Sequence, residues 1–147
     1  MDRLLLLLGI AAVAGMAAAL LQRRTDRRPV RTGWTVPDQV RRGDFARPGT
    51  PWLVAVFTSS TCEACDGVLS RARPLESSEV AVVEVEANAD REVHDRYGID
   101  AVPLVLVVDD EGAVRHHHLG PVTSTHLWAS LAEVRQPGSV PDGCSAS

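Results

Sequence analysis

The chain has 147 residues, 45% of them hydrophobic, which suits one compact domain with a short appendage and excludes wholesale disorder. Three cysteines are too few for a small scaffold held together by disulfides. All 15 basic residues are arginine, which excludes lysine chemistry such as a Schiff base or a P-loop lysine. The formal net charge of −4 gives no support for nucleic-acid binding.

Charge and hydrophobicity are unevenly distributed. Residues 1–31 contain six Arg and two acidic residues and carry a net charge of +4, whereas the rest of the chain carries −8. Leu4 to Leu21 is an unbroken run of 18 apolar or small residues. As a helix it would be about 27 Å long, enough for the hydrocarbon core of a bilayer. We therefore predict a single transmembrane anchor over residues 1–22, with a cleaved signal peptide as the alternative.

The segment after this run is basic and irregular. Five arginines between residues 23 and 31 favour a cytoplasmic soluble domain by the positive-inside rule, although the extracytoplasmic side stays open. Residues 23–44 are rich in Arg and Pro and predict a tether. Four apolar residues in or next to the tether are expected to dock on the following domain: Trp34, Val36, Val40 and Phe45.

The body of the chain predicts alternating strands and helices. Continuous apolar or β-branched runs indicate strands, and apolar positions at helical spacing indicate helices. The predicted order is strand 52–57, helix 62–73, strand 80–85, helix 90–97, strands 104–108 and 113–119, and a helix starting at Thr123 or Thr125 and ending at Arg135. This order predicts an α/β fold with a central mixed sheet covered on both faces and a hairpin at one edge. Residues 137–147 are expected to form a flexible tail.

The motif Cys62-Glu63-Ala64-Cys65 lies where a buried strand is expected to end and a helix to begin. Unpaired N–H groups and the helix dipole at such a position favour a thiolate. Two intervening residues allow the second thiol to reach the first, so the pair could attack a disulfide and then resolve the mixed disulfide. A zinc half-site is the alternative, but zinc needs four ligands and the third cysteine, Cys144, lies in the tail.

A proline at the start of an apolar strand adds a second signal, because proline cannot lie inside a paired strand. The sequence resembles thioredoxin-fold thiol–disulfide oxidoreductases in strand 53–57, Cys62-x-x-Cys65, Arg96-Tyr97-Gly98-Ile99, Val102-Pro103 and Gly120. The resemblance implies a thioredoxin-like three-layer α/β/α sandwich over residues 45–136 that exchanges disulfides with protein dithiol or disulfide partners. Cys62 would be the attacking nucleophile and Cys65 the resolving thiol. Pro103 would be cis and face the disulfide, and the backbone of Val102 would pair with the substrate chain.

The sequence departs from this family's pattern at several positions. Thr61 stands where Trp precedes the first cysteine, and Glu63-Ala64 replaces the common Gly-Pro. Val56 occupies the position of a buried Asp, and Glu84 aligns with a family Lys, so Glu84 is a candidate proton relay for Cys65. The alternative is that Glu84 and Glu86 simply face solvent. These departures keep open a non-enzymatic binding or redox-sensing module, and also metal delivery through the cysteines and a histidine.

The remaining polar candidates are expected to be ordinary surface residues. His116-His117-His118 lies on the predicted edge strand, where alternation allows only His116 and His118 to converge, and we expect a solvated edge with no metal. His94 and His126 are expected on helix surfaces, and Cys144 is expected to be an exposed free cysteine. The Cys-x-x-Cys motif itself requires no organic cofactor.

Overall fold

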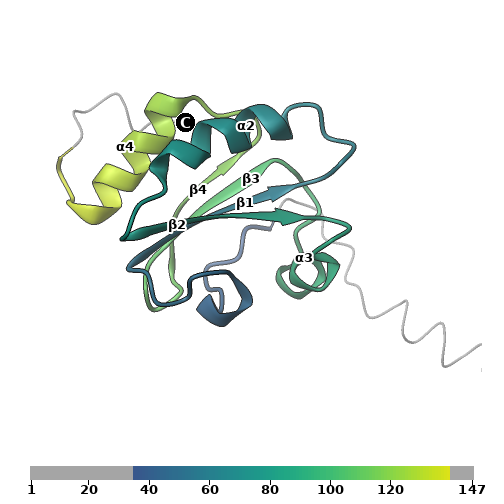
Figure 1. The fold of residues 1–147 in the computed structure, drawn as a ribbon, viewed down its shortest axis with the longest axis horizontal. Helices are drawn as coiled ribbons and strands as arrows, with labels where there is room; N and C mark the ends of the chain where they lie inside the picture. The colour runs from purple at the N-terminus through teal and green to yellow at the C-terminus, as the bar shows by residue number, and fades with distance from the viewer. Residues whose placement is uncertain (1–34, 140–147) are drawn as a thin grey trace, which may run out of the picture. The chain divides into compact units, whose positions relative to one another are not determined.

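The computed structural model describes residues 35–139 (Figure 1). The strand and helix order is the one expected from the sequence. The elements are the 3-10 turn η1 (Arg42–Asp44), β1 (Trp52–Thr58), α2 (Cys65–Ala72), the 3-10 turn η2 (Arg73–Leu75), β2 (Val80–Glu86), α3 (Arg91–Tyr97), β3 (Leu104–Val108), β4 (Val114–Leu119) and α4 (Ser124–Arg135).

The four strands form one mixed sheet in the order β2-β1-β3-β4. β1 runs parallel to β2 and antiparallel to β3, and β3 and β4 form an antiparallel hairpin at the edge. β1 has a neighbour on each side and a covered face above and below. This explains why its sequence is a continuous apolar run, in which only Trp52 is not fully buried.

Helices cover both faces of the sheet, which confirms the expected sandwich (Figure 1). On one face Val54 and Val56 pack with residues of α2 and α4, including Val68 and Leu127. On the other face the alternate residues of β1 pack beneath α3. Because successive side chains of a strand point to opposite faces, this one strand supplies both hydrophobic cores.

The chain between residues 35 and 51 packs against the hairpin and the start of the sheet. Val40 is only 2% exposed, and its N–H donates to the carbonyl of Gly112 at 2.8 Å. Gln39 forms a β-bridge with Ala113. This part of the expected 23–44 tether is thus packed onto the domain, as anticipated for Val40 but not for its polar neighbours.

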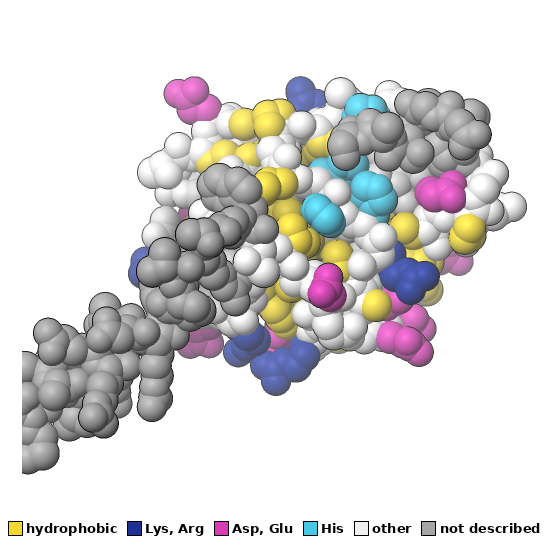
Figure 2. Space-filling model, turned by 180° about the vertical axis from the view of Figure 1, so that it is seen from behind, with side chains coloured by type: hydrophobic (Ala, Val, Ile, Leu, Met, Phe, Trp, Pro, Cys, Tyr) yellow, Lys and Arg dark blue, Asp and Glu magenta, His cyan; other side chains and the backbone are white. Residues whose placement is uncertain are grey.

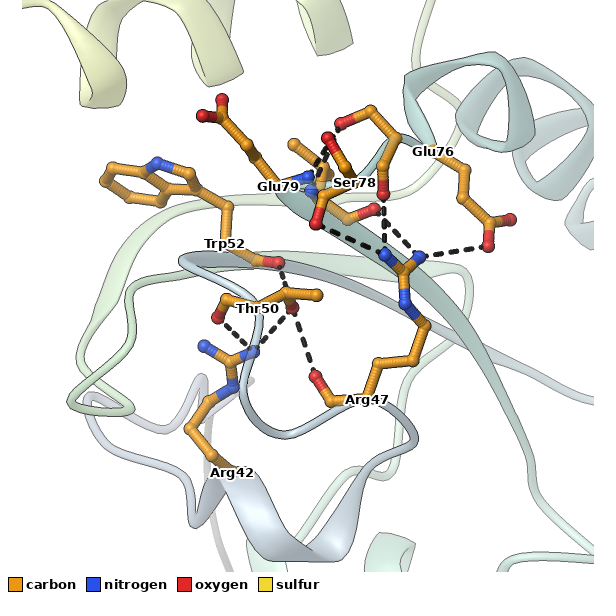
Figure 3. Close-up of polar contacts among 9 residues, drawn as sticks. Arg42, Arg47, Thr50, Trp52, Glu76, Ser78 and Glu79 are labelled. Atoms are coloured by element: carbon orange, nitrogen blue, oxygen red, sulfur yellow. Dashed lines mark hydrogen bonds and ion pairs between the residues drawn. The ribbon is translucent and has the colours of Figure 1, made fainter.

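Two arginines organise the end of the sheet at which β1 begins (Figure 3). The buried guanidinium of Arg42 donates to the carbonyl of Thr50 at 2.9 Å and to that of Asp109 at 2.7 Å. Arg47 donates to the carbonyl of Ser77 at 2.6 Å, in the turn before β2. These contacts join the segment before β1 to two other turns. The carbonyls of those turns lie outside the strands, and the arginines supply them with hydrogen-bond donors.

Local signals at the helix ends agree with the expected elements, with one difference at α2. Thr123 caps α4 by accepting from the N–H of His126, and Gly98 ends α3 in the left-handed conformation, with φ 62°. α2 begins at Cys65 rather than at Cys62, because the chain forms a separate turn between β1 and the helix.

Within residues 35–139, no helix has the length and apolar character needed to cross a membrane. The expected anchor over residues 1–22 lies outside the described residues, as does Cys144 in the tail.

Candidate functional site

The two cysteines of the motif form a disulfide in the structure. The S–S distance is 2.08 Å and the Cα atoms lie 5.5 Å apart. Cys65 is the first residue of α2 and is only 2% exposed, whereas Cys62 is half-buried in the preceding turn. A thiolate from another molecule therefore meets the sulfur of Cys62 first, and Cys65 is shielded by the fold.

The turn that presents Cys62 is closed by backbone hydrogen bonds. The N–H of Cys62 donates to the carbonyl of Ser59 at 3.0 Å, and the N–H of Cys65 donates to the carbonyl of Cys62 at 3.2 Å. The side chains of Ser59 and Thr61 lie within hydrogen-bond distance of each other, at 3.1 Å. Thr61 occupies the position expected for Trp, so a much smaller, exposed side chain immediately precedes Cys62.

Glu86, at the end of β2, holds this turn from the neighbouring strand. Its Oε1 accepts from the N–H of Ser60 at 3.0 Å, and its Oε2 accepts from the N–H groups of Asn88 and Ala89 at 2.8 and 2.9 Å. Hydrogen bonds from the N–H groups of Ala89 and Asn88 hold the pKa of the Glu86 carboxyl below its usual value. The carboxylate is therefore an ionised anchor of the turn, and its side chain is still partly open to solvent, in line with the solvent-facing alternative.

The proline expected to face the disulfide lies at the same end of the sheet. The Val102–Pro103 peptide bond is cis. Phe57 pairs with Leu104 in the sheet, so the antiparallel register places Pro103 beside Thr58, where β1 gives way to the turn of Cys62. The carbonyl of Pro103 accepts from the N–H of Gly120 at 2.8 Å. Pro103 is buried, whereas Val102 is only half-buried, which leaves part of it accessible from solvent.

Glu84, the candidate proton relay, has partners other than the cysteines. Its Oε1 accepts from the hydroxyl of Thr58 at 2.9 Å, and its Oε2 lies 4.0 Å from a guanidinium nitrogen of Arg73. Glu84 pairs in register with Val56 and so lies on the α2 side of the sheet, but it is exposed to solvent, as the solvent-facing alternative has it. The structure brings this carboxylate to the end of β1, and a relay role for it stays a prediction.

The histidines are less exposed than expected. His118 is 8% exposed and contacts the hydroxyl of Ser130 in α4 at 2.8 Å, so β4 is not a fully solvated edge. The rings of His116 and His118 converge as expected, with centroids 4.8 Å apart. Burial lowers the pKa of His118 to about 4. Figure 2 shows histidines grouped beside hydrophobic side chains on this face of the molecule.

His94 is also buried, contrary to the expected helix surface. It is 6% exposed, its Nε2 lies 2.9 Å from the carbonyl oxygen of Val85, and its ring meets Phe57 edge-on. Among residues 35–139, no three or more His, Cys, Asp or Glu side chains are arranged to hold a metal ion.

Comparisons with known proteins identify the fold. No protein-family model and no curated protein sequence matches the chain. Among solved structures, the chain is similar to a malarial protein, with a TM-score of 0.52, 14% identity, and coverage of 57% of this chain and 97% of that one. It is similar to a thioredoxin from Fasciola hepatica, with a TM-score of 0.51, 20% identity, and coverage of 58% and 83%. It is also similar to a thioredoxin-fold protein from Helicobacter pylori, with a TM-score of 0.50, 13% identity, and coverage of 63% of this chain and 81% of that one. The domain thus has the thioredoxin fold.

Proposed function

We propose that this protein is a thiol–disulfide oxidoreductase that exchanges disulfides with protein partners through Cys62 and Cys65. The observation that carries the proposal is the Cys62–Cys65 disulfide at the β1–α2 junction of a thioredoxin fold. Cys62 is partly exposed and Cys65 is buried, so the pair has distinct candidates for the attacking and the resolving thiol. The partly exposed Val102, next to the cis proline, is the proposed site at which backbone groups of the partner pair with the domain.

In the reducing direction the chemistry requires only the two thiols. The Cys62 thiolate attacks a sulfur of the partner's disulfide, and the partner's other sulfur leaves as a thiolate. Cys65 then loses its proton and attacks the sulfur of Cys62, which breaks the mixed disulfide and releases the second partner thiolate. Two electrons pass to the partner, and the Cys62–Cys65 bond is formed. Another dithiol protein would reduce this bond for the next cycle, and the oxidising direction reverses the same steps.

The surroundings of Cys65 support a specialised rather than a general reductant. Val56, at the position of the family's buried Asp, is 0% exposed and packs in the core beside α2. A valine cannot accept a proton from the resolving thiol. The proposed acceptor is therefore Glu84 of β2, which pairs with Val56 in the sheet. Its Oε1 accepts from the hydroxyl of Thr58, the last residue of β1, which places the carboxylate beside the strand that leads into the Cys62 turn.

Trapping the mixed disulfide tests the proposal. We expect a Cys65→Ser variant to accumulate a mixed disulfide with a disulfide-containing test protein, because the resolving thiol is missing. With Cys144 replaced by Ser in both variants, a Cys62→Ser variant should form none, since the remaining Cys65 is buried. Wild-type protein should reduce the test protein catalytically in the presence of dithiothreitol. Absence of turnover by the wild type, together with absence of a trapped species, would instead support a non-enzymatic binding or redox-sensing module.

We also propose that residues 1–22 anchor the protein in the cell membrane as a single span. The apolar run Leu4 to Leu21 supports this placement, and the arginines that follow it favour a cytoplasmic domain. Labelling of Cys62 in intact cells with an impermeant thiol reagent, after mild reduction, tests the side of the membrane. Protection until the cells are lysed is the expected result, and labelling of intact cells would place the domain outside.

A further inference from the structure

Glu86 makes a denser set of contacts than an exposed carboxylate at a strand end needs. It accepts three backbone N–H groups, two from the turn after β2 and one, from Ser60, in the turn that carries Cys62. The side-chain amide of Asn88 adds donors to Oε1 of Glu86 at 3.3 Å and to the hydroxyl of Ser60 at 3.3 Å. The N–H of Ala87 donates to the carbonyl of Thr58 at 3.0 Å. Two turns from neighbouring strands are thereby joined by Glu86, by Asn88 and by one backbone hydrogen bond.

The hydrogen bond between Glu86 and Ser60 lies close to Cys62 along the chain. Ser60 precedes Cys62 by two residues, so their Cα atoms are separated by at most about 8 Å. Cys62 is outside the helical segment of α2, and its N–H bonds back to Ser59, the neighbour of the anchored Ser60. Cys65, by contrast, is fixed by burial within α2. The freedom of the Ser59–Thr61 turn therefore decides how often the two sulfurs meet once the disulfide is reduced.

We propose that Glu86 is a positioning residue for the Cys62–Cys65 pair, which holds the Cys62 turn against β2 and thereby favours the disulfide over the dithiol. Closing a disulfide within a chain depends on the effective concentration of one thiol near the other, and a fixed turn raises that concentration. This inference rests on the proposed function for its biological meaning, but its physical content is an equilibrium of the isolated protein.

Equilibration with glutathione measures this equilibrium directly. Two molecules of reduced glutathione convert the Cys62–Cys65 disulfide into two thiols and become glutathione disulfide, so one S–S bond breaks, one forms, and two protons pass to the cysteines. The full chain is held at a series of glutathione ratios, quenched in acid and alkylated. Peptide mass spectrometry then gives the oxidised fraction of Cys62 and Cys65 separately from Cys144. The variants compared are Glu86→Ala, Glu86→Gln and, as a matched control, Glu79→Ala.

The control removes a carboxylate from the other end of the same strand. Glu79 immediately precedes β2 and pairs with Arg135 of α4, so its loss changes the surface charge without touching the Cys62 turn. We expect Glu86→Ala to shift the equilibrium constant about tenfold toward the dithiol, the scale of one lost charge-assisted hydrogen bond. Glu86→Gln, which keeps an acceptor oxygen, should shift it less. Glu79→Ala should stay within about twofold of wild type.

A purely structural role is separated by unfolding the oxidised and the reduced protein. A residue that only stabilises the fold lowers both unfolding free energies equally, whereas the proposal requires a larger loss in the oxidised form. An unchanged glutathione equilibrium in a folded Glu86→Ala variant, or an equal shift in Glu79→Ala, would overturn the inference. If Glu86→Ala does not fold, the Glu86→Gln variant decides by the same two measurements. Disulfide turnover is scored separately, so an inactive wild type refutes the proposed function and leaves this inference to its own result.

Discussion

The buried His118 gives the domain a defined weakness toward acid. Ser130 donates its hydroxyl hydrogen to the carbonyl of His126 at 2.8 Å, so His118 must supply the hydrogen in its own bond with Ser130. Burial is the first cause that lowers the pKa of His118 from 6.5 to about 4, and the nearby His116, His126 and His117 add to it. The neutral ring therefore belongs to the folded state, whereas the unfolded chain protonates this residue near its ordinary pKa.

The sign and the size of the effect follow by linkage. A depressed pKa in the folded state means that stability is fully present above pH 6.5 and is lost as the pH falls toward 4. At pH 5 the unfolded state binds nearly a full proton more than the folded state, and integration of this difference from pH 7 to pH 5 gives a loss of about 2 kcal/mol. We expect urea unfolding of the wild type to show this loss.

A His118→Gln variant isolates the contribution of this residue. Its amide can still donate to Ser130, but it does not titrate, so the variant should retain about 2 kcal/mol more of its stability between pH 7 and pH 5 than the wild type does. His116, whose pKa is also lowered chiefly by burial, is present in both proteins, and a His116→Gln background removes its own titration from the comparison. Parallel pH profiles for the two proteins would refute the reasoning.

Two glycines give opposite predictions for the same substitution. Gly112 has a φ of +88°, and an added Cβ would lie 2.0 Å from the carbonyl oxygen of Val40, so Gly112→Ala should cost about 3 kcal/mol or more in denaturant unfolding. A loss below about 1 kcal/mol would contradict this assignment. Gly67 lies within α2, and an added Cβ would meet only the mobile end of Arg71, at 2.9 Å, so Gly67→Ala should stabilise the domain by about 0.5–1 kcal/mol. A lower melting temperature than wild type would show that the Arg71 side chain cannot move aside.

The sequence was sufficient to predict the elements because most of its signals are local. The apolar run at β1, the stop at Gly98 and the cap at Thr123 each depend on neighbouring residues, and all three are found in the structure. The Cys-x-x-Cys pair was predictable for the same reason, since two intervening residues bring the sulfurs together wherever a turn precedes a helix.

What the sequence did not predict depends on partners distant along the chain. His94 and His118 were expected at the surface because histidine is polar, but each is buried against a polar group, the carbonyl of Val85 and the hydroxyl of Ser130. Such partners make burial tolerable, and they are visible only once the fold is known. Glu86 left a weak local trace, an acidic residue at a strand end followed by a turn with Asn88, which is a pattern for side-chain capping of backbone N–H groups.

Residues 38–40 are hydrogen-bonded to the chain between β3 and β4, and this fixes where the segment before β1 lies. The N–H of Val114 donates to the carbonyl of Asp38 at 2.9 Å, so the segment before β1 is hydrogen-bonded to the chain where β4 begins. The turn between β3 and β4 lies at the far end of β3 from Pro103. Residues 38–40 are therefore held at the end of the sheet opposite the sulfur pair, and the Cys62 turn makes none of these contacts.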